Sequence, residues 1–194
     1  MKNREESLTL LKEYTKSESL LKHALSVEAA MRWYAKHFNC NEQEVEQWAI
    51  TGLLHDFDYE MYPEPTEPDG HPFKGNQILA ELGYSDEIRE AIMGHATYTG
   101  VERKTQMAKA LFAVDELSGL ITAATLVRPD KNLNTLTAKS VKKKIKDKAF
   151  ARGCNRDDIK LGAQELEIEI GQHIENTIQA LQVIASELGL DGES

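Results

Sequence analysis

Apolar residues recur with a helical period along almost the whole chain. Residues 17–38 show the pattern well, because spacings of three and four residues place apolar side chains on one face of an amphipathic helix. The apolar stripe of this segment comprises Leu20, Leu21, Ala24, Val27, Met31, Tyr34 and Phe38. No segment shows a convincing alternation of apolar and polar residues, the pattern typical of a half-buried β-strand. The sequence therefore predicts an all-α fold.

Capping and breaking residues divide the rest of the chain into further helices. Asn41 and Glu44 have the spacing of a capping box, which would start a helix that delivers His55 and Asp56 at its C-terminal end. Four of the five prolines fall within residues 57–72, so this segment is expected to be a surface loop. The other predicted helices are 73–83, 86–96, 105–126, 137–150 and a final pair, or one helix broken near Gly162 and Gly171, between Asn155 and Gly189.

Length, charge and cysteine content exclude several classes of protein. The 194 residues suit one domain with a sizeable core, alone or with an appended helical subdomain. The net charge of -9 argues against binding to a nucleic-acid polymer or an anionic membrane, because both require a dominant basic surface. Residues 1–17 do not resemble a secretory signal, and no run of about 18 apolar residues occurs. Cys40 and Cys154 form no C-x-x-C pair and are expected to be ordinary thiols in a reducing cytoplasm.

Histidines and aspartates stand at the edges of the predicted apolar helices. His23 lies inside an apolar stripe, His55-Asp56 ends an apolar helix, and His71 lies where the loop meets the next helix. His95 lies near the end of "EIREAIMGHA", and Asp115 interrupts the apolar run "ALFAVDELSGL". A buried carboxylate such as Asp115 requires a cation or strong hydrogen bonds. Imidazole and carboxylate together suit divalent Fe, Mn, Co, Ni or Zn.

Two of the six histidines are not expected to bind this ion. His37 is fourteen residues beyond His23 on the same predicted helix, which places it about 21 Å along the axis. His173 lies in the mixed polar stretch "EIGQHIEN" and is expected on a solvated helix face.

The order of these residues resembles the HD superfamily of metal-dependent phosphohydrolases over about residues 20 to 127. The short signature H…HD…D falls on His23, His55, Asp56 and Asp115, and His71 and His95 resemble the additional ligands of the two-metal branch. The stretches "HPFKGNQIL" and "LFAVDELSGLITAATLVRP" resemble a group of small predicted hydrolases within the superfamily. The motifs of the cyclic-dinucleotide phosphodiesterases and of the alarmone hydrolases are missing from the sequence.

The resemblance implies a metal-binding helical domain in residues 1–130 and a C-terminal helical extension packing on it in residues 131–194. It also implies one or two divalent transition-metal ions and a metal-activated hydroxide that cleaves a phosphate mono- or diester of a nucleotide or small metabolite. In this hypothesis Asp56 bridges two ions. One ion is completed by His23, His55 and Asp115, and the other by His71 and His95.

Further residues are candidates for binding or protonating the substrate. Lys74 follows His71 by three residues and could face the same pocket as a catalytic or phosphate-binding cation. Arg128 and Lys143 are candidate substrate-binding cations, although the lysine-rich segment 139–148 could equally be a solvated helix face. Asp58 could donate a proton to the leaving group or could cap the loop. The acidic residues of the loop suggest a substrate of modest charge; they are Asp58, Glu60, Glu64, Glu67 and Asp69.

Two other functions remain compatible with the sequence. Some members of the superfamily use a similar set of four histidines and two aspartates to hold a diiron centre that activates O₂. A nucleotide-sensing module could also keep the fold and the ligands without catalysing a reaction.

Overall fold

The computed structural model describes residues 2–65 and 69–192, and most of these residues are helical. Within the described residues there are ten α-helices, two short 3₁₀-helices and no β-strand, which confirms the all-α prediction. The α-helices are α1 (Arg4–Tyr14), α2 (Glu18–His37), α3 (Glu42–Leu54), α4 (Phe73–Glu81), α5 (Asp86–His95), α6 (Gln106–Leu126), α7 (Ala138–Lys146), α8 (Arg156–Glu165), α9 (Ile170–Gln182) and α10 (Ala185–Leu188). The 3₁₀-helices are η1 (Thr97–Thr99) and η2 (Leu133–Thr135).

Side-chain caps start most of the predicted helices where the sequence places them. Asn41 and Glu44 form a reciprocal capping box at the start of α3. Ser85 caps α5 and Thr105 caps α6, each by accepting a hydrogen bond from a backbone N–H of the first turn. Soon after α4 ends, Gly83 adopts a φ of 81°, which favours glycine. These starts and stops are local, and for this reason the sequence predicts them well.

The structure differs from the sequence prediction at three points. Helix α1 was not predicted, although Asn3 and Glu6 form a second reciprocal capping box at its start. Gly162 does not break a helix but lies inside α8, where an added Cβ would meet Ala113 Cα of α6 at 2.5 Å. The basic helix ends at Lys146 rather than at residue 150. Residues 66–68 of the predicted proline-rich loop, including Glu67, lie outside the described residues.

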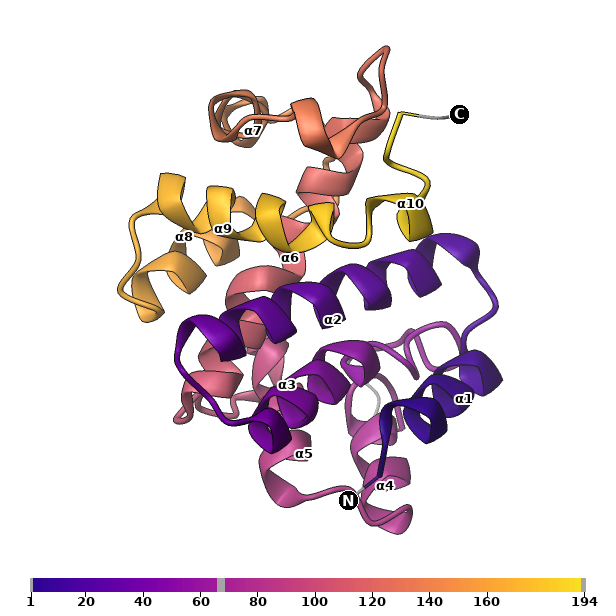
Figure 1. Cartoon of the computed structure of the whole chain (residues 1–194). Coiled ribbons are helices and arrows are strands. Elements are labelled where there is room, and N and C mark those ends of the chain that lie inside the picture. Colours follow the sequence, from indigo (N-terminus) through magenta and orange to yellow (C-terminus); the bar gives the residue numbers. More distant parts are fainter. Residues whose placement is uncertain (1, 66–68, 193–194) are drawn as a thin grey trace.

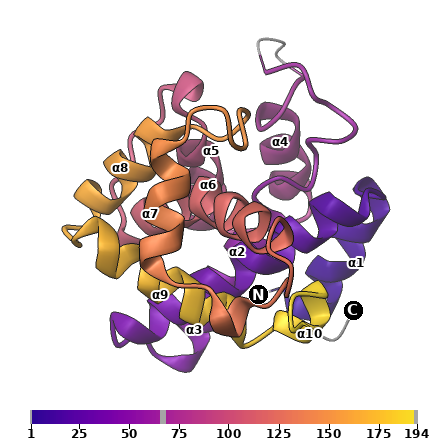
Figure 2. The same cartoon turned by 90° about the horizontal axis from the view of Figure 1, so that it is seen from above.

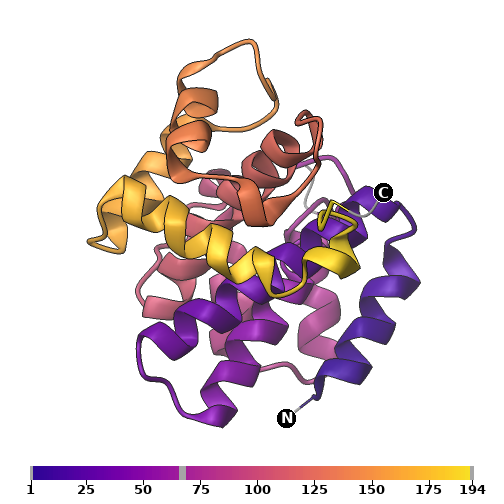
Figure 3. The same cartoon turned by 45° about the horizontal axis from the view of Figure 1, so that its top comes forward.

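Helix α6 forms the centre of the molecule and is surrounded by the other helices (Figures 1 and 2). It contacts α2, α5, α7, α8 and α9, while α3 packs against α2 on one side and α1 on the other. The yellow C-terminal helices lie along α2 in Figure 3. One hydrophobic cluster includes residues from Leu10 to Leu190, so the segment beyond residue 130 shares its core with the rest. A domain boundary at residue 130 stays a prediction.

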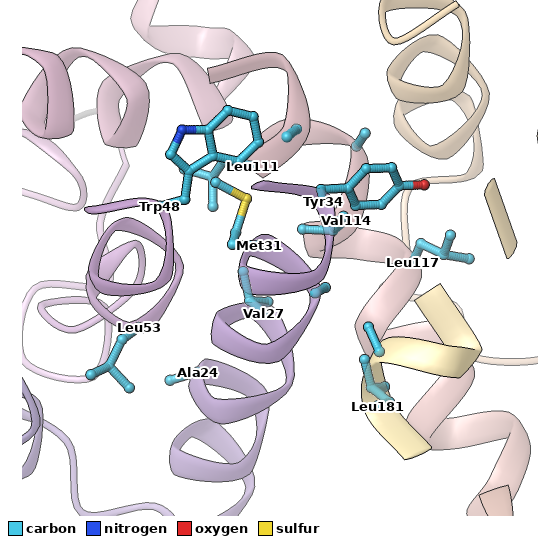
Figure 4. Close-up of a cluster of buried hydrophobic side chains, with 14 of the residues drawn as sticks. Ala24, Val27, Met31, Tyr34, Trp48, Leu53, Leu111, Val114, Leu117 and Leu181 are labelled. Atoms are coloured by element: carbon cyan, nitrogen blue, oxygen red, sulfur yellow. The ribbon is translucent and has the colours of Figure 1, made fainter. Parts of the chain in front are cut away.

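Helices α2 and α3, which position His23 and His55, pack closely against each other. An added Cβ at Gly52 of α3 would lie 2.8 Å from Val27 O of α2, so only glycine allows the two backbones to come this near. In Figure 4 the side chains of Met31 of α2, Trp48 of α3 and Leu111 of α6 lie close together. This packing fixes α2, α3 and α6 side by side, with His23, His55 and Asp115 on neighbouring helices. Among the described helices, none combines the length and apolarity needed to cross a membrane.

Candidate metal centre

The six predicted ligands converge from five parts of the fold. His23 comes from α2, and His55 caps the C-terminus of α3, directly before Asp56. The other three come from the end of the loop before α4, the last residue of α5 and the middle of α6; they are His71, His95 and Asp115. Asp56 and Asp115 are partly exposed, whereas His55, His71 and His95 are buried.

The two carboxylate oxygens of Asp56 face two different pairs of histidines. Oδ1 lies 3.1 Å from His71 Nε2 and 3.3 Å from His95 Nε2, and the two Nε2 atoms are 3.3 Å apart. Oδ2 lies 3.5 Å from His55 Nε2 and 4.0 Å from His23 Nε2. Asp56 is therefore the central residue of the cluster.

Asp115 completes the side of the cluster that contains His23 and His55. Its Oδ1 atom lies 3.1 Å from His23 Nε2 and 3.4 Å from His55 Nε2. The sequence separates His23 from Asp115 by more than ninety positions, and only the packing of α2 against α6 brings them together.

The spacing and chemistry of these side chains fit divalent metal ions. Two groups could each hold an ion, His23 with His55 and Asp56, and Asp56 with His71 and His95. Ligand atoms bound to one zinc-like ion lie roughly 3 to 3.5 Å apart, which matches most of the distances in the cluster. His55 Nε2 is buried and makes no hydrogen bond to any described residue. Such a buried nitrogen needs a partner, and a metal ion would supply one.

Hydrogen bonds on the other ring nitrogens orient three of the histidines. His55 Nδ1 lies 2.8 Å from Gly52 O, and His95 Nδ1 is hydrogen-bonded to Ile92 O. His71 Nδ1 lies 2.7 Å from Asp58 Oδ1. Since a carbonyl or carboxylate can only accept, each Nδ1 carries the donated hydrogen. In the neutral imidazole Nε2 is then free to bind a metal.

Opposite charges stabilise one another in the protein without metal. Burial alone would lower the pKa of His55, but the carboxylates of Asp56 and Asp115 raise it well above its usual value. Burial likewise opposes charge on His71, yet Asp56 and Asp58 raise its pKa to about 9. Burial would raise the pKa of Asp115, but the charge of His55 and the hydrogen bond from His23 lower it. Protons thus occupy the place that metal ions would take.

The cluster opens into a pocket of about 410 Å³. Five of the six predicted ligands line it, whereas His55 is fully buried behind them. The other lining residues are Tyr59, Ala96, Thr97, Tyr98, Glu116, Gly119, Asn155 and Asp158. No lysine or arginine appears among the described residues of this lining.

An acidic wall of the pocket was not predicted from the sequence. Glu116 follows Asp115 on α6, and Asp158 lies in the first turn of α8. Asn155 connects the two, because its backbone N–H donates to Glu116 Oε2 at 3.1 Å and its Nδ2 donates to Asp158 Oδ2 at 2.7 Å. Burial raises the pKa of both carboxyl groups. Glu116 could have been suspected from its place beside Asp115, but nothing in the sequence links α8 to the site.

The side chain of Asp58 lies behind His71, away from the pocket lining. It is 1% exposed, and its two oxygens accept hydrogen bonds from His71 Nδ1 and from the backbone N–H of Gly75, both at 2.7 Å. A carboxylate in this position cannot reach a leaving group in the pocket without breaking both bonds. Its predicted role as a proton donor is therefore not supported by its position.

The predicted substrate-binding cations also lie outside the pocket lining. Lys74 does not share a helix face with His71, because α4 begins only at Phe73, and its Nζ atom lies 3.5 Å from Asp69. Arg128, beyond the end of α6, pairs with Asp130 at 2.9 Å. Lys143 is exposed on α7. Their predicted roles stay predictions that the positions do not favour.

Neither of the remaining histidines joins the cluster, but one of them is not where the sequence suggested. His37 is exposed and stacks on Trp33, with ring centroids 5.0 Å apart. The expectation that His173 lies on a solvated face is wrong, because it is fully buried. Its Nδ1 lies 2.6 Å from Tyr34 Oη, and its Nε2 lies 2.8 Å from Ala113 O. The apolar residues at helical spacing around it, Ile170, Ile174 and Leu181, could have indicated this burial.

Comparison with known proteins agrees with this geometry. A family model described as HD domain matches residues 20–120, which is more than half of the chain and includes all six clustered ligands. No curated protein and no solved structure matches the chain. The resemblance inferred from the histidine-aspartate pattern is thereby confirmed, and the chain belongs to the HD domain family.

Proposed function

We propose that the protein is a metal-dependent phosphohydrolase that cleaves a phosphate mono- or diester of a nucleotide or small metabolite. The observation that carries the proposal is the position of Asp56, with one carboxylate oxygen toward His71 and His95 and the other toward His55 and His23. A carboxylate placed between two pairs of imidazoles is suited to bridge two divalent ions.

Six side chains would hold the ions in this proposal. His23, His55 and Asp115 would bind one ion, His71 and His95 the other, and Asp56 both. Ions of this kind supply Lewis acidity and lower the pKa of a bound water toward 7. The protein contributes the orientation of its ligands through their Nδ1 hydrogen bonds and a pocket that admits a small substrate.

The charge of the pocket restricts the substrate. Because the described lining contains no lysine or arginine, the negative charge of a phosphate would be compensated by the ions alone. Glu116 and Asp158 add further negative charge to the pocket lining. These features support a substrate with one phosphate group rather than a polyphosphate. Polar groups such as Thr97 and Asn155 are available for the organic part of the ester.

Metal analysis followed by a substrate panel tests the proposal. Purified protein is analysed for bound metal, loaded with Mn or Fe, and assayed against phosphate monoesters and diesters with and without oxygen. Turnover under anaerobic conditions is expected. Turnover that requires O₂ would instead establish the diiron oxygenase, for which the same four histidines and two aspartates are suited. Tight binding of a nucleotide without product over hours would establish a sensing module.

A further inference from the structure

We propose that Asp58 is a positioning residue that holds His71 in the metal-binding state and thereby controls occupation of the second metal position. This position is the one formed by Asp56, His71 and His95. The inference rests on the metal centre of the proposed function, but it does not depend on which reaction that centre catalyses.

The contacts of Asp58 connect a metal ligand to the start of a helix. Oδ1 accepts from His71 Nδ1 and Oδ2 accepts from the backbone N–H of Gly75, each at 2.7 Å. The side chain is 1% exposed, so water cannot replace either bond. Gly75 is the third residue of α4, and the N-cap residue Pro72 makes no side-chain cap. Asp58 thus caps α4 from seventeen residues earlier in the chain.

His71 needs this carboxylate because of where it lies. His55 and His95 stand at the C-terminal ends of α3 and α5, where each Nδ1 reaches the carbonyl oxygen three residues earlier. His71 precedes α4 and has no helix turn behind it. A side chain from the preceding loop supplies the acceptor instead. Among the described residues, Asp58 is therefore the acceptor that fixes the hydrogen on His71 Nδ1, although it is not itself one of the clustered ligands.

Asp58 occupies space that is free because Gly75 of α4 has no side chain. An added Cβ at Gly75 would lie 2.7 Å from Asp58 Cγ and from its Oδ2. A methyl group there must displace the carboxylate, since such a short contact is not tolerated. Gly75→Ala therefore disturbs the same bond as a change of Asp58 while keeping the negative charge.

An asparagine cannot replace the aspartate in this position. Its side chain has one acceptor oxygen and one donor nitrogen, whereas both His71 Nδ1 and the Gly75 N–H donate. If the asparagine oxygen faces Gly75, its NH₂ group donates to His71 Nδ1. The ring hydrogen then moves to Nε2, which can no longer bind an ion.

The test measures metal stoichiometry and affinity of the full-length Asp58→Asn and Gly75→Ala variants with Mn²⁺ and Zn²⁺. Wild type is expected to bind two ions. Both variants are expected to keep the ion at His23, His55 and Asp115 and to bind the second ion about 10 to 100 times more weakly. Gly153→Ala serves as the matched control, because an added Cβ there meets no atom within 4 Å. Unchanged binding of the second ion, equal weakening of both ions, or one ion in wild type would overturn the inference.

Activity at saturating metal separates positioning from proton donation. If Asp58 only positions His71, kcat of Asp58→Asn returns close to the wild-type value when excess metal fills the second position. A kcat that stays at least tenfold low with both ions bound would overturn the inference in favour of direct catalysis. Two-ion binding that depends on Asp58 in a protein without phosphohydrolase activity would contradict the proposed function while supporting this inference.

Discussion

Buried histidines in two regions of this protein have pKa values shifted in opposite directions. In the candidate metal centre, His55 and His71 face carboxylates, and their pKa values lie above the usual range. His173 of α9 is also buried, against α2 and α6, but burial lowers its pKa to about 4. Its partners are the hydroxyl of Tyr34 and the carbonyl of Ala113, which carry no charge.

The difference shows that the groups next to a buried histidine, more than its burial, decide its pKa and whether one of its nitrogens is available to bind a metal ion. Ala113 O can only accept, so His173 carries its hydrogen on Nε2, and Tyr34 Oη donates to Nδ1. Both nitrogens are satisfied and no ligand is needed. His55 Nε2, by contrast, has carboxylates near it but no hydrogen bond to a described residue. A buried histidine with neutral partners belongs to the packed core. Buried histidines with carboxylate partners form a site at which metal ions can replace protons.

The largest effect is expected from removal of the central carboxylate. Asp56→Asn should abolish binding of both ions and reduce phosphohydrolase activity by more than about a thousandfold, since metal catalysis contributes several kcal/mol. Elemental analysis and steady-state kinetics measure the two losses. Asp147→Asn is the control, because this exposed aspartate accepts a single backbone hydrogen bond that asparagine can also accept. Retention of two ions in Asp56→Asn would contradict the bridging role.

The neutral histidine should make the protein less stable in acid. The pKa of His173 is about 6.5 in the unfolded chain and about 4 in the fold. Stability from neutral His173 is therefore complete above pH 6.5 and is lost as the pH falls toward 4, by about 3 kcal/mol. Urea denaturation of wild type and His173→Gln at pH 7 and pH 4.5 measures this loss. The variant should be less stable at pH 7 but should lose less stability on acidification.

The charged histidines should have the opposite pH dependence in the metal-free protein. The pKa of His71 is about 9 in the fold, above its unfolded value, so its contribution is complete below pH 6.5 and is lost as the pH rises through 9. Thermal unfolding with a chelator at pH 6.5 and pH 9.5 measures it. Because a metal ion takes the place of the protons, saturating Zn²⁺ should remove most of this loss. An equal loss with and without Zn²⁺ would argue against a metal at His71.

The smallest effect concerns the acidic wall of the pocket. Glu116→Gln removes one negative charge facing the substrate and should lower KM for a phosphate monoester by about two- to fivefold at low salt, with little change in kcat. The effect should shrink in 0.5 M salt, because the screening length in the open pocket is then about 4 Å. Glu102→Gln, an exposed glutamate outside the pocket lining, is the control. An unchanged KM at low salt would show that the wall does not face the bound phosphate.

Local signals in the sequence were sufficient for most helices. The capping box of Asn41 and Glu44 and the N-caps Ser85 and Thr105 act within one helical turn, so they can be recognised without knowledge of the fold. The same signal at Asn3 and Glu6 would have identified α1. Of the two arrangements that the sequence allows for the last segment, the helix broken near Gly162 is wrong, because this glycine serves close packing against α6 and only the neighbouring helix reveals that use.

The identity of the candidate ligands was also accessible from the sequence, but their surroundings were not. His23, His55, Asp56 and Asp115 were selected by their order and by their apolar context, and the structure brings them together. The position of Asp58 depends on how the loop returns to α4, and no local pattern encodes it. The prediction that Lys74 faces the pocket requires His71 and Lys74 to lie on one helix, but α4 starts only at Phe73.

The all-α architecture, most helix boundaries and the set of imidazoles and carboxylates that can bind metal follow from the amino-acid sequence without knowledge of the fold. Helical periodicity and capping act over a few residues, and side-chain chemistry is intrinsic to each residue. The packing of the helices was needed to establish that His173 is buried and neutral, that α8 contributes to the acidic wall, and that Asp58 accepts a hydrogen bond from His71. These properties depend on which groups from distant helices become neighbours, because the partners set both the proton affinity and the free coordination position of a buried side chain.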